Sequence, residues 1–220
     1  KNDGMKIKVE ASYLVYTDEI NELINKKLNI NYDDLGYSRE WLIVDIFLKS
    51  EGNLENVFRQ ICDPIRPTSY VALSESRYRF QFQLLTGEKK EEMASISKAH
   101  DLISNWLTPN QYNIEYLSTF EFKGRCANNF QIENFFLIGK AAYQIPPYAA
   151  QSLNSGIRDA ANLIWKINLI KKYKAKNNII HSYNIERNAK IRQTIKSSIV
   201  LGQLIDSISV ALQNSTPLEE

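Results

Sequence analysis

The chain has 220 residues, of which 44% are hydrophobic and 24% charged, and its 27 basic and 25 acidic residues give a formal net charge of +2. This globular composition supplies enough apolar residues for one large core or two small ones, and the low net charge gives no electrostatic drive toward nucleic acid or an anionic membrane. Only 8 residues are Gly, about half the average share of ~7%, and no GxGxxG or GxxxxGK[ST] pattern occurs, which argues against a Gly-rich nucleotide site built within these residues.

The sequence also argues against a metal-binding protein, a secreted protein and a membrane protein. The two cysteines, Cys62 and Cys126, lie far apart without metal-ligand spacing, and His100 and His181 are isolated, so no metal site is predicted. The first residues lack the apolar core of a signal peptide, and we therefore expect reduced thiols and a cytoplasmic location. Apolar runs such as 135–138 are too short to span a bilayer, and no membrane segment is expected.

The first part of the chain is predicted to begin with a half-buried strand over residues 6–16, where apolar and polar side chains alternate. A polar turn and a short helix around 22–24 follow, with Asp18 as a candidate cap for that helix. Residues 31–36 are expected to form a loop. The run at 41–49 is apolar and rich in β-branched residues, which indicates a central strand.

The middle of the chain combines strands with one helix. Residues 68–73 and 77–86 are predicted to form a hairpin, because the second arm alternates aromatic residues with Arg and Gln. Apolar side chains at helical spacing predict a helix over 89–107. Alternation returns over 112–122, which indicates an antiparallel strand, and a short apolar strand follows at 134–138.

Two long amphipathic helices are predicted over 153–173 and 182–212, with Asn154 or Ser155 as a candidate cap for the first. This order predicts an α+β fold: an antiparallel or mixed sheet with an inserted helix, then a strand–loop–helix unit and a long C-terminal helix. A strand that leads into a loop and a helix usually joins a parallel sheet. Because 134–138 has no evident βαβ partner, the sheet it joins is expected upstream of residue 1.

The densest signal for function is the segment 136–166, which reads FLIGKAAYQIPPYAAQSLNSGIRDAANLIWK. Here a strand delivers the chain to a loop, and the loop enters a helix N-terminus. The free backbone N–H groups and the dipole at a helix start favour an anion or a polarised carbonyl. Asp159 and Asn162 share one face of this helix and are expected to tie it to neighbouring loops.

This segment resembles the second flavin motif of the FAD-dependent aromatic-ring hydroxylases, the single-component flavoprotein monooxygenases, and in particular the phenylpropionate and polyketide hydroxylases. Their pattern is G-D-A-A-H, x-x-P-P, G-G-Q-G and then M-N-S-G-I-R-D-A-x-N-L-x-W-K-L. The stretch from Asn154 to Lys166 matches the last part nearly residue for residue. The resemblance identifies the chain as a homologue of these enzymes.

Other blocks occur in the family's order. Q-I-C-D-P-I-R-P at 60–67 resembles Q-x-C-D-P-x-R-P of the substrate domain, and 79–88 resembles R-W-E-F followed by L-L-P-G-E. Y-L-V-x-x-D at 13–18 resembles the close of the flavin domain, and Y-x-x-E-R at 183–187 resembles a helix start. The resemblance divides the chain into the end of an FAD-binding domain (1–30), a substrate-binding-like sheet domain (31–133), a second flavin-motif unit (134–175) and a C-terminal helical segment (176–220).

The resemblance also implies functional residues. Such enzymes use FAD, NAD(P)H and O₂ to hydroxylate a phenolic ring, and the cofactor carries the chemistry. Positions expected to contact FAD are Asp18, Gly139, Lys140, Pro146, Pro147, Leu153 and Asn154. Positions expected to contact an aromatic substrate are Arg66, Arg79 and Phe82. No catalytic residue is assigned.

The chain departs from the family where its members contact the flavin. Lys140 replaces the Asp that contacts the ribityl chain, Tyr143 replaces the His, and Glu19 replaces the Gly after Asp18. Residues that replace loop glycines are Ala149, Ala150 and Ser152. Each added Cβ obstructs close approach where φ must be positive. The adenine-binding βαβ unit is expected to precede residue 1, in a segment of at least ~30 residues.

Structural roles are the alternatives for several of these positions. Lys140 is expected to be a surface lysine rather than a phosphate ligand, and Arg66 and Arg79 fit either a substrate carboxylate or a structural ion pair. Cys62 is expected in a core. A set of aromatic residues fits sheet core better than a substrate pocket: Trp41, Tyr78, Phe80, Phe82, Tyr116, Phe120 and Phe122.

Two functional hypotheses follow. The first is part of a FAD-dependent aromatic hydroxylase, which needs a complementing Rossmann-containing segment. The second is a non-catalytic relative that binds a small molecule or a partner. A homodimer is a further expectation, because Leu201, Leu204, Ile208 and Ala211 form an apolar stripe on the last helix, although intramolecular packing is the favoured explanation of such a stripe.

Overall fold

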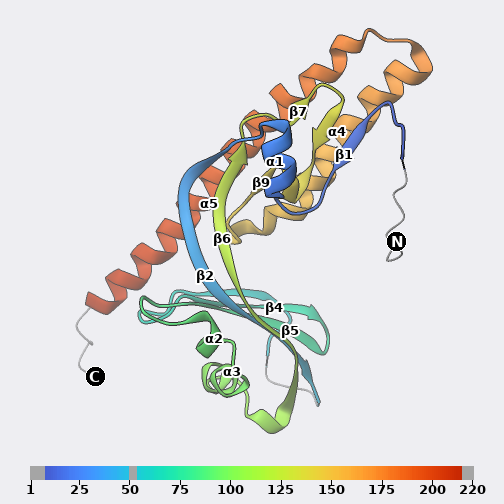
Figure 1. Ribbon diagram of the computed structural model, residues 1–220. Coiled ribbons are helices and arrows are strands. Elements are labelled where there is room, and N and C mark those ends of the chain that lie inside the picture. The colour runs from blue at the N-terminus through green and yellow to red at the C-terminus, as the bar shows by residue number, and fades with distance from the viewer. Residues whose placement is uncertain (1–7, 50–53, 215–220) are drawn as a thin grey trace. The chain divides into compact units, whose positions relative to one another are not determined.

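The computed structural model describes residues 8–49 and 54–214, which form two compact units (Figure 1). Unit 1 contains Lys1–Leu35 and Gly124–Ser198, and unit 2 contains Gly36–Lys123 and Ile199–Glu220. The chain passes between the units along two long strands and one long helix, β2 (Tyr32–Leu48), β6 (Tyr112–Ala127) and α5 (Ser182–Asn214). The predicted α+β class is confirmed.

Unit 1 contains a three-stranded sheet in the order β1-β8-β7. β1 (Leu14–Tyr16) runs parallel to β8 (Phe135–Leu137), and β7 (Gln131–Ile132) is antiparallel to β8. The prediction that this strand has no parallel partner within the chain is therefore wrong, because β1 pairs with it; further strands of the sheet upstream stay a prediction. The predicted strand over 6–16 is also too long: of its described residues only Leu14–Tyr16 pair, and its first two lie outside the described residues.

The helix after β1 is α1 (Glu22–Leu28), and Asn21 caps it. The Asn21 Oδ1 atom accepts hydrogen bonds from the backbone N–H of Leu23 at 3.0 Å and of Ile24 at 3.2 Å. The prediction that Asp18 is this cap is wrong, because its carboxylate instead accepts from the N–H of Glu19 at 2.8 Å. An Asn is among the best N-caps, so the sequence offered the correct residue three positions later.

The larger sheet has six strands in the order β3-β4-β5-β2-β6-β9. The bounds of the remaining strands are β3 (Phe58–Ile61), β4 (Thr68–Ser74), β5 (Arg77–Gln83) and β9 (Tyr143–Gln144). The predicted hairpin is β4 and β5, and β2 is central, as predicted. The loop predicted over 31–36 is wrong, because β2 already begins at Tyr32. The first residues of β2 are polar and show no apolar alternation, so the sequence did not mark them as a strand. They belong to a strand whose neighbour in the sheet is β6.

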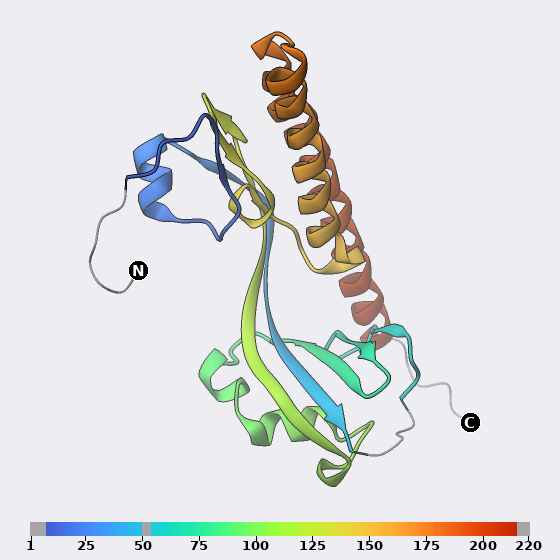
Figure 2. The same cartoon turned by 90° about the vertical axis from the view of Figure 1, so that its right-hand side faces the viewer.

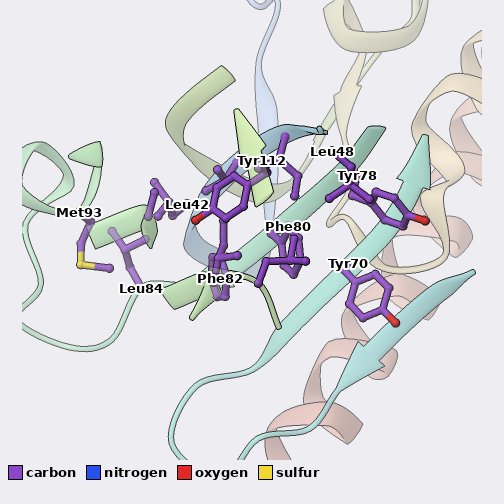
Figure 3. Close-up of a cluster of buried hydrophobic side chains, with 14 residues drawn as sticks. Leu42, Leu48, Tyr70, Tyr78, Phe80, Phe82, Leu84, Met93 and Tyr112 are labelled. Carbon is purple, nitrogen blue, oxygen red and sulfur yellow. The ribbon is translucent and has the colours of Figure 1, made fainter. Parts of the chain in front are cut away.

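One core lies within unit 2, between the sheet and two short helices, α2 (Lys90–Met93) and α3 (Ile96–Ile103). Figure 3 shows Leu42 of β2 and Phe80 and Phe82 of β5 pointing into this cluster of buried side chains. The predicted single helix over 89–107 is split, because Ser95 starts α3 by accepting a hydrogen bond from the Lys98 N–H at 3.4 Å. A 3₁₀ turn, η1 (Pro109–Gln111), leads into β6.

The predicted aromatic core is confirmed for four of its members and not for the rest. Trp41, Tyr78, Phe80 and Phe82 are buried. On β6, Tyr116 and Phe120 are exposed, and Phe122 is half-buried. Cys62 is half-buried rather than in a core, whereas Cys126 is buried.

Both predicted long helices are present, as α4 (Gln151–Tyr173) and α5. Within unit 1, α4 and the first part of α5 lie side by side, joined through η4 (Asn177–His181) (Figure 2). The fully buried Lys166 ammonium ties them, donating to Glu186 at 2.7 Å and to Asn162 at 2.6 Å. Further 3₁₀ turns are η2 (Gly139–Ala141) and η3 (Tyr148–Ala150).

The last helix corrects one sequence argument. The helical stretch Asn177–Leu212 is long and apolar enough to cross a bilayer, with a window of mean hydropathy 1.4, so the claim that every apolar stretch is too short does not hold for it. One such helix is weak evidence for a membrane span, because core helices pass the same test. Ile191 and Ile195 on this helix are buried within the protein. Leu201, Leu204 and Ile208 remain exposed, so the alternative that they are intramolecular core is wrong.

Candidate functional site

The parallel pair β1 and β8 brings two distant sequence motifs to one sheet edge. Parallel strands end at the same edge, and the Ile138 N–H donates to the Tyr16 carbonyl at 3.0 Å where both strands end. The residues that follow are Glu19 on one side and Lys140 on the other. The Lys140 ammonium lies 3.6 Å from the Glu19 carboxylate, and both side chains are more than 70% exposed. The two positions where charges replace the family's residues are thus in contact.

The turn after β8 requires its glycine. Gly139 has φ +58°, in the left-handed region that disfavours larger residues. A Cβ built on Gly139 lies 3.8 Å from the Gly156 Cα, so the turn rests directly on the first part of α4. Two of the glycines that the chain retains therefore meet at this contact, and they bring the strand end and the helix together.

The buried side chain of Asp159 on α4 holds this turn by hydrogen bonds. Its buried carboxylate accepts hydrogen bonds from the Gly139 N–H at 3.2 Å, the Tyr143 hydroxyl at 2.5 Å and the Arg187 Nε at 2.6 Å. Burial, together with the nearby carboxylate, raises the pKa of Tyr143 far above its usual range, so the phenol is a neutral donor. The prediction that Asp159 ties the helix to a neighbouring loop is confirmed. Asn162 instead donates to Glu186 of the helix α5 at 2.7 Å, so the prediction of a loop partner is wrong for it.

The start of α4 keeps an unusual backbone. Ala150 lies in the left-handed region with φ +48° and ψ +39°, at a position where the resemblance expects glycine, and no side chain caps the helix. Asn154 and Ser155 lie inside the helix, so the prediction that either caps it is wrong. The left-handed conformation costs a residue that carries a Cβ about 1 kcal/mol.

The two prolines form the loop between β9 and α4. Pro146 is buried and Pro147 is half-buried. The buried Ser198 hydroxyl of α5 lies 3.0 Å from the carbonyl oxygens of both Pro146 and Tyr148, and it fixes this loop. Motif reasoning missed Ser198, because nothing in its local sequence marks it.

The remaining cofactor candidates lie on the surface. Asp18, Leu153 and Asn154 are exposed, as Lys140 is. Gly139, Lys140 and Asp18 lie at the ends of β1 and β8, whereas Leu153 and Asn154 lie in the first turn of α4. The Gly139–Gly156 contact connects these two groups. Their role in cofactor binding stays a prediction.

The candidate substrate residues do not line one surface. Arg66 forms a two-point ion pair with Glu88, with distances of 2.5 and 2.7 Å, and this pairing lowers the pKa of Glu88. Arg79 pairs in the same way with Asp45, at 2.6 and 2.7 Å. Phe82 is buried in the core, three residues from Arg79 and hence on the opposite face of β5. Both guanidinium groups are thus engaged by the protein itself, and a substrate role for the three residues stays a prediction.

No group of three or more His, Cys, Asp or Glu side chains that could hold a metal ion occurs within residues 8–49 and 54–214. Burial raises the pKa of the Cys126 thiol to about 11, so this cysteine is a neutral thiol at physiological pH.

The comparisons with known proteins agree with this geometry. Residues 1–198 match the family model described as "FAD binding domain". A probable NADH-specific resorcinol 4-hydroxylase of Rhodococcus jostii (strain RHA1) is 29% identical over 92% of the chain and 38% of its own length. A 3-(3-hydroxy-phenyl)propionate/3-hydroxycinnamic acid hydroxylase of Comamonas testosteroni is 28% identical over 99% of the chain and 39% of its own length.

Solved structures show the same fold. Aklavinone-11 hydroxylase, determined with FAD and aklavinone, aligns with TM-score 0.79 at 19% identity over 91% of this chain and 39% of its own. The flavin-dependent monooxygenase PieE, determined with FAD and substrate, aligns with TM-score 0.80 at 18% identity over 95% and 38%. The chain thus spans less than two fifths of the length of each of these four proteins.

Proposed function

Because the chain belongs to the FAD-binding domain family, we propose that it supplies the second flavin motif and the substrate-binding sheet of a FAD-dependent aromatic-ring hydroxylase. The observation that carries the proposal is the parallel pairing of β1 with β8, which joins the two flavin motifs at one edge. The proposed reaction uses NAD(P)H and O₂ to hydroxylate a phenolic substrate in the cytoplasm. Relatives named for resorcinol and hydroxyphenylpropionate support a phenol as the substrate class.

Two backbone positions support FAD as the ligand. Gly139, in the turn after β8, and Ala150, directly before α4, both lie in the left-handed region, where the resemblance expects glycines beside the flavin. The N–H groups at the start of α4 would meet the polar edge of the flavin. Pro146 and Pro147 would position the ring, and FAD, when bound, supplies the oxygen-transfer chemistry. Lys140 would place a cation where the family has a carboxylate, next to the ribityl chain or a phosphate.

A complementing Rossmann-containing segment is part of the proposal, whether it lies in the same polypeptide or in another chain. Parallel sheets are normally covered on both faces, yet β1 is an edge strand with Leu14 and Val15 exposed. On α4, the side chains of Leu153, Ile157 and Ile164 share a stripe and are 75%, 58% and 65% exposed. An apolar strand edge beside an apolar helix face favours an added α/β layer.

The test is flavin binding with and without that segment. The chain would be titrated with FAD alone, and then in the presence of a separately expressed Rossmann-type βαβ segment, with visible absorbance and flavin fluorescence as readouts. We expect weak or no binding by the chain alone and a yellow complex with the segment. NADH oxidation stimulated by resorcinol or 3-(3-hydroxyphenyl)propionate would then establish the activity. Failure of every combination to hold flavin would refute the proposal.

A non-catalytic binding module is the second candidate. The contact between Glu19 and Lys140 favours it, because two altered flavin positions now satisfy each other's charge. On this alternative, calorimetry detects 3-(3-hydroxyphenyl)propionate binding to the chain with no flavin present, and added FAD changes nothing. A homodimer through the exposed stripe of Leu201, Leu204 and Ile208 is a separate proposal. Light scattering of the purified chain tests it, and a monomeric mass at every concentration would exclude it.

A further inference from the structure

A row of polar side chains crosses three neighbouring strands of unit 1 beside the Gly139–Ala141 turn. Its members are Tyr32 of β2, Arg125 of β6 and Gln144 of β9, and the sheet order is β2-β6-β9. Arg125 and Gln144 are direct partners in the antiparallel register, so their side chains leave the same face with Cβ atoms about 5 Å apart. The Arg125 guanidinium carbon lies 5.5 Å from the centre of the Tyr32 ring. These three residues are called the Arg125 row.

The Arg125 row is attached to the flavin motif. The Tyr32 hydroxyl donates a hydrogen bond to the Ala141 carbonyl oxygen at 2.6 Å, and it lies 3.4 Å from the Asn25 Oδ1 of α1. Burial raises the pKa of Tyr32 to about 12 despite the opposing effect of Arg125, so the hydroxyl stays a neutral donor. The row therefore borders both the turn after β8 and the helix after β1.

The row carries hydrogen-bonding capacity that the protein does not use. Among the described residues Arg125 donates no side-chain hydrogen bond and joins no ion pair, and its contact is with the Tyr32 ring. The Gln144 Oε1 atom is buried and has no hydrogen-bond partner. A guanidinium has five N–H donors and no acceptor, and a buried carbonyl without a donor is costly.

Arg125 differs in this respect from the other half-buried or buried arginines. Arg66 pairs with Glu88, Arg79 with Asp45, Arg187 with Asp159, and Arg192 with Asp33. A guanidinium that has no acid beside it can bind the carboxylate or phosphate of a ligand, because its planar fork of donors matches these groups. The neighbouring unpaired carbonyl of Gln144 demands the opposite chemistry, an O–H or N–H donor.

We propose that Arg125 and Gln144 form a niche that binds an oxyanion which also carries a hydrogen-bond donor. Arg125 binds the anion through two N–H groups, and Gln144 Oε1 accepts from a hydroxyl or N–H of the same ligand. The proposal deepens the proposed function and rests on it for the origin of the ligand. The oxyanion is a phosphate of a dinucleotide or the carboxylate of an aromatic hydroxy acid.

Calorimetric titration of the full chain at low ionic strength tests the niche, with sodium pyrophosphate and 3-(3-hydroxyphenyl)propionate as separate probes. We expect binding of at least one probe, weakened about tenfold or more in Arg125→Gln, since a charged hydrogen bond is lost. Gln144→Leu weakens binding less. Arg158→Gln is the matched control, because it removes an equal charge from an exposed position on α4, and its affinity stays within about twofold of wild type.

Each outcome decides the proposal. Pyrophosphate binding that depends on Arg125 supports a dinucleotide phosphate, and hydroxyphenylpropionate binding that depends on Arg125 supports a substrate carboxylate. No binding of either probe overturns the niche, and so does an equal loss in Arg158→Gln. Melting curves check that Arg125→Gln folds; should it not fold, Arg125→Lys keeps the charge without the fork and is expected to bind less tightly than wild type. Anion binding needs no flavin, so its failure is distinct from failure of the FAD titration.

Discussion

Replacement of Asp159 by Ala is the sharpest test of how the candidate site is held together. The Asp159 carboxylate is fully buried and accepts from Gly139, Tyr143 and Arg187. The Arg187 side chain is itself only 10% exposed. Asp159→Ala leaves that guanidinium buried without its acid, with the Ser155 carbonyl oxygen at 3.4 Å as its remaining acceptor among the described residues, and removal of one member of a buried pair costs about 3–5 kcal/mol. The free energy of unfolding of a typical domain is about 5–15 kcal/mol, so the loss is a large share.

The assay is urea denaturation followed by circular dichroism, which gives the free energy of unfolding from the midpoint and slope. Asp101→Ala, on the exposed side of α3, is the matched control and is expected to change stability by less than about 0.5 kcal/mol. Tyr143→Phe removes one of the three donors and is expected to cost about 1–2 kcal/mol. A loss below about 1 kcal/mol in Asp159→Ala would show that the carboxylate does not hold the turn against α4.

Three further predictions concern charge and backbone. Hydrogen bonding from Lys166 lowers the pKa of Glu186 from 4.5 to about 2. The contribution of the Glu186 carboxylate to stability is therefore complete above its unfolded pKa of 4.5 and is lost as the pH falls toward 2. Melting temperatures measured over that pH range should fall less steeply in Glu186→Gln than in wild type. Ala150→Gly removes the strain of a left-handed residue that carries a Cβ, and this gain offsets the entropy that glycine adds to the unfolded chain, so stability stays within about 0.5 kcal/mol of wild type. Ala161→Gly, in the exposed middle of α4, is the control and costs about 1 kcal/mol. Equal losses in the two variants would contradict the left-handed conformation of Ala150. Lys140→Asp by itself is expected not to restore FAD binding to the chain, because the alanines before α4 remain, and flavin fluorescence quenched by that variant would disprove this.

The elements with a strong local period were predicted well. The alternation over 77–86 placed Phe80 and Phe82 in the core and Arg79 on the other face, and β5 follows it. The apolar spacing over 153–173 and 182–212 predicted α4 and α5 almost to their bounds. Each depends on side chains within one strand or helix, and short-range periodicity is what a sequence displays directly. The flavin motif was equally visible, because its residues are consecutive.

Partners distant in the chain could not be predicted. The sequence did not reveal that Leu14–Tyr16 would pair in parallel with Phe135–Leu137, or that Glu19 would contact Lys140. Arg66 and Arg79 could be assigned to a substrate or to an ion pair until the structure placed Glu88 and Asp45 beside them. Such pairs depend on which strands become neighbours, and no local pattern encodes that.

The sequence by itself determined the family, the two long helices, the hairpin and the place of the flavin motif, because each is written in consecutive residues or a short period. Only the tertiary structure decided which polar groups are paired within the protein. It gave Arg187 a buried partner in Asp159, and within the part of the chain that the structure describes it placed Arg125 against the Tyr32 ring with no acid. The physical reason is that the cost of a buried charge depends on what lies around it in space, and most of those neighbours are far away in the chain.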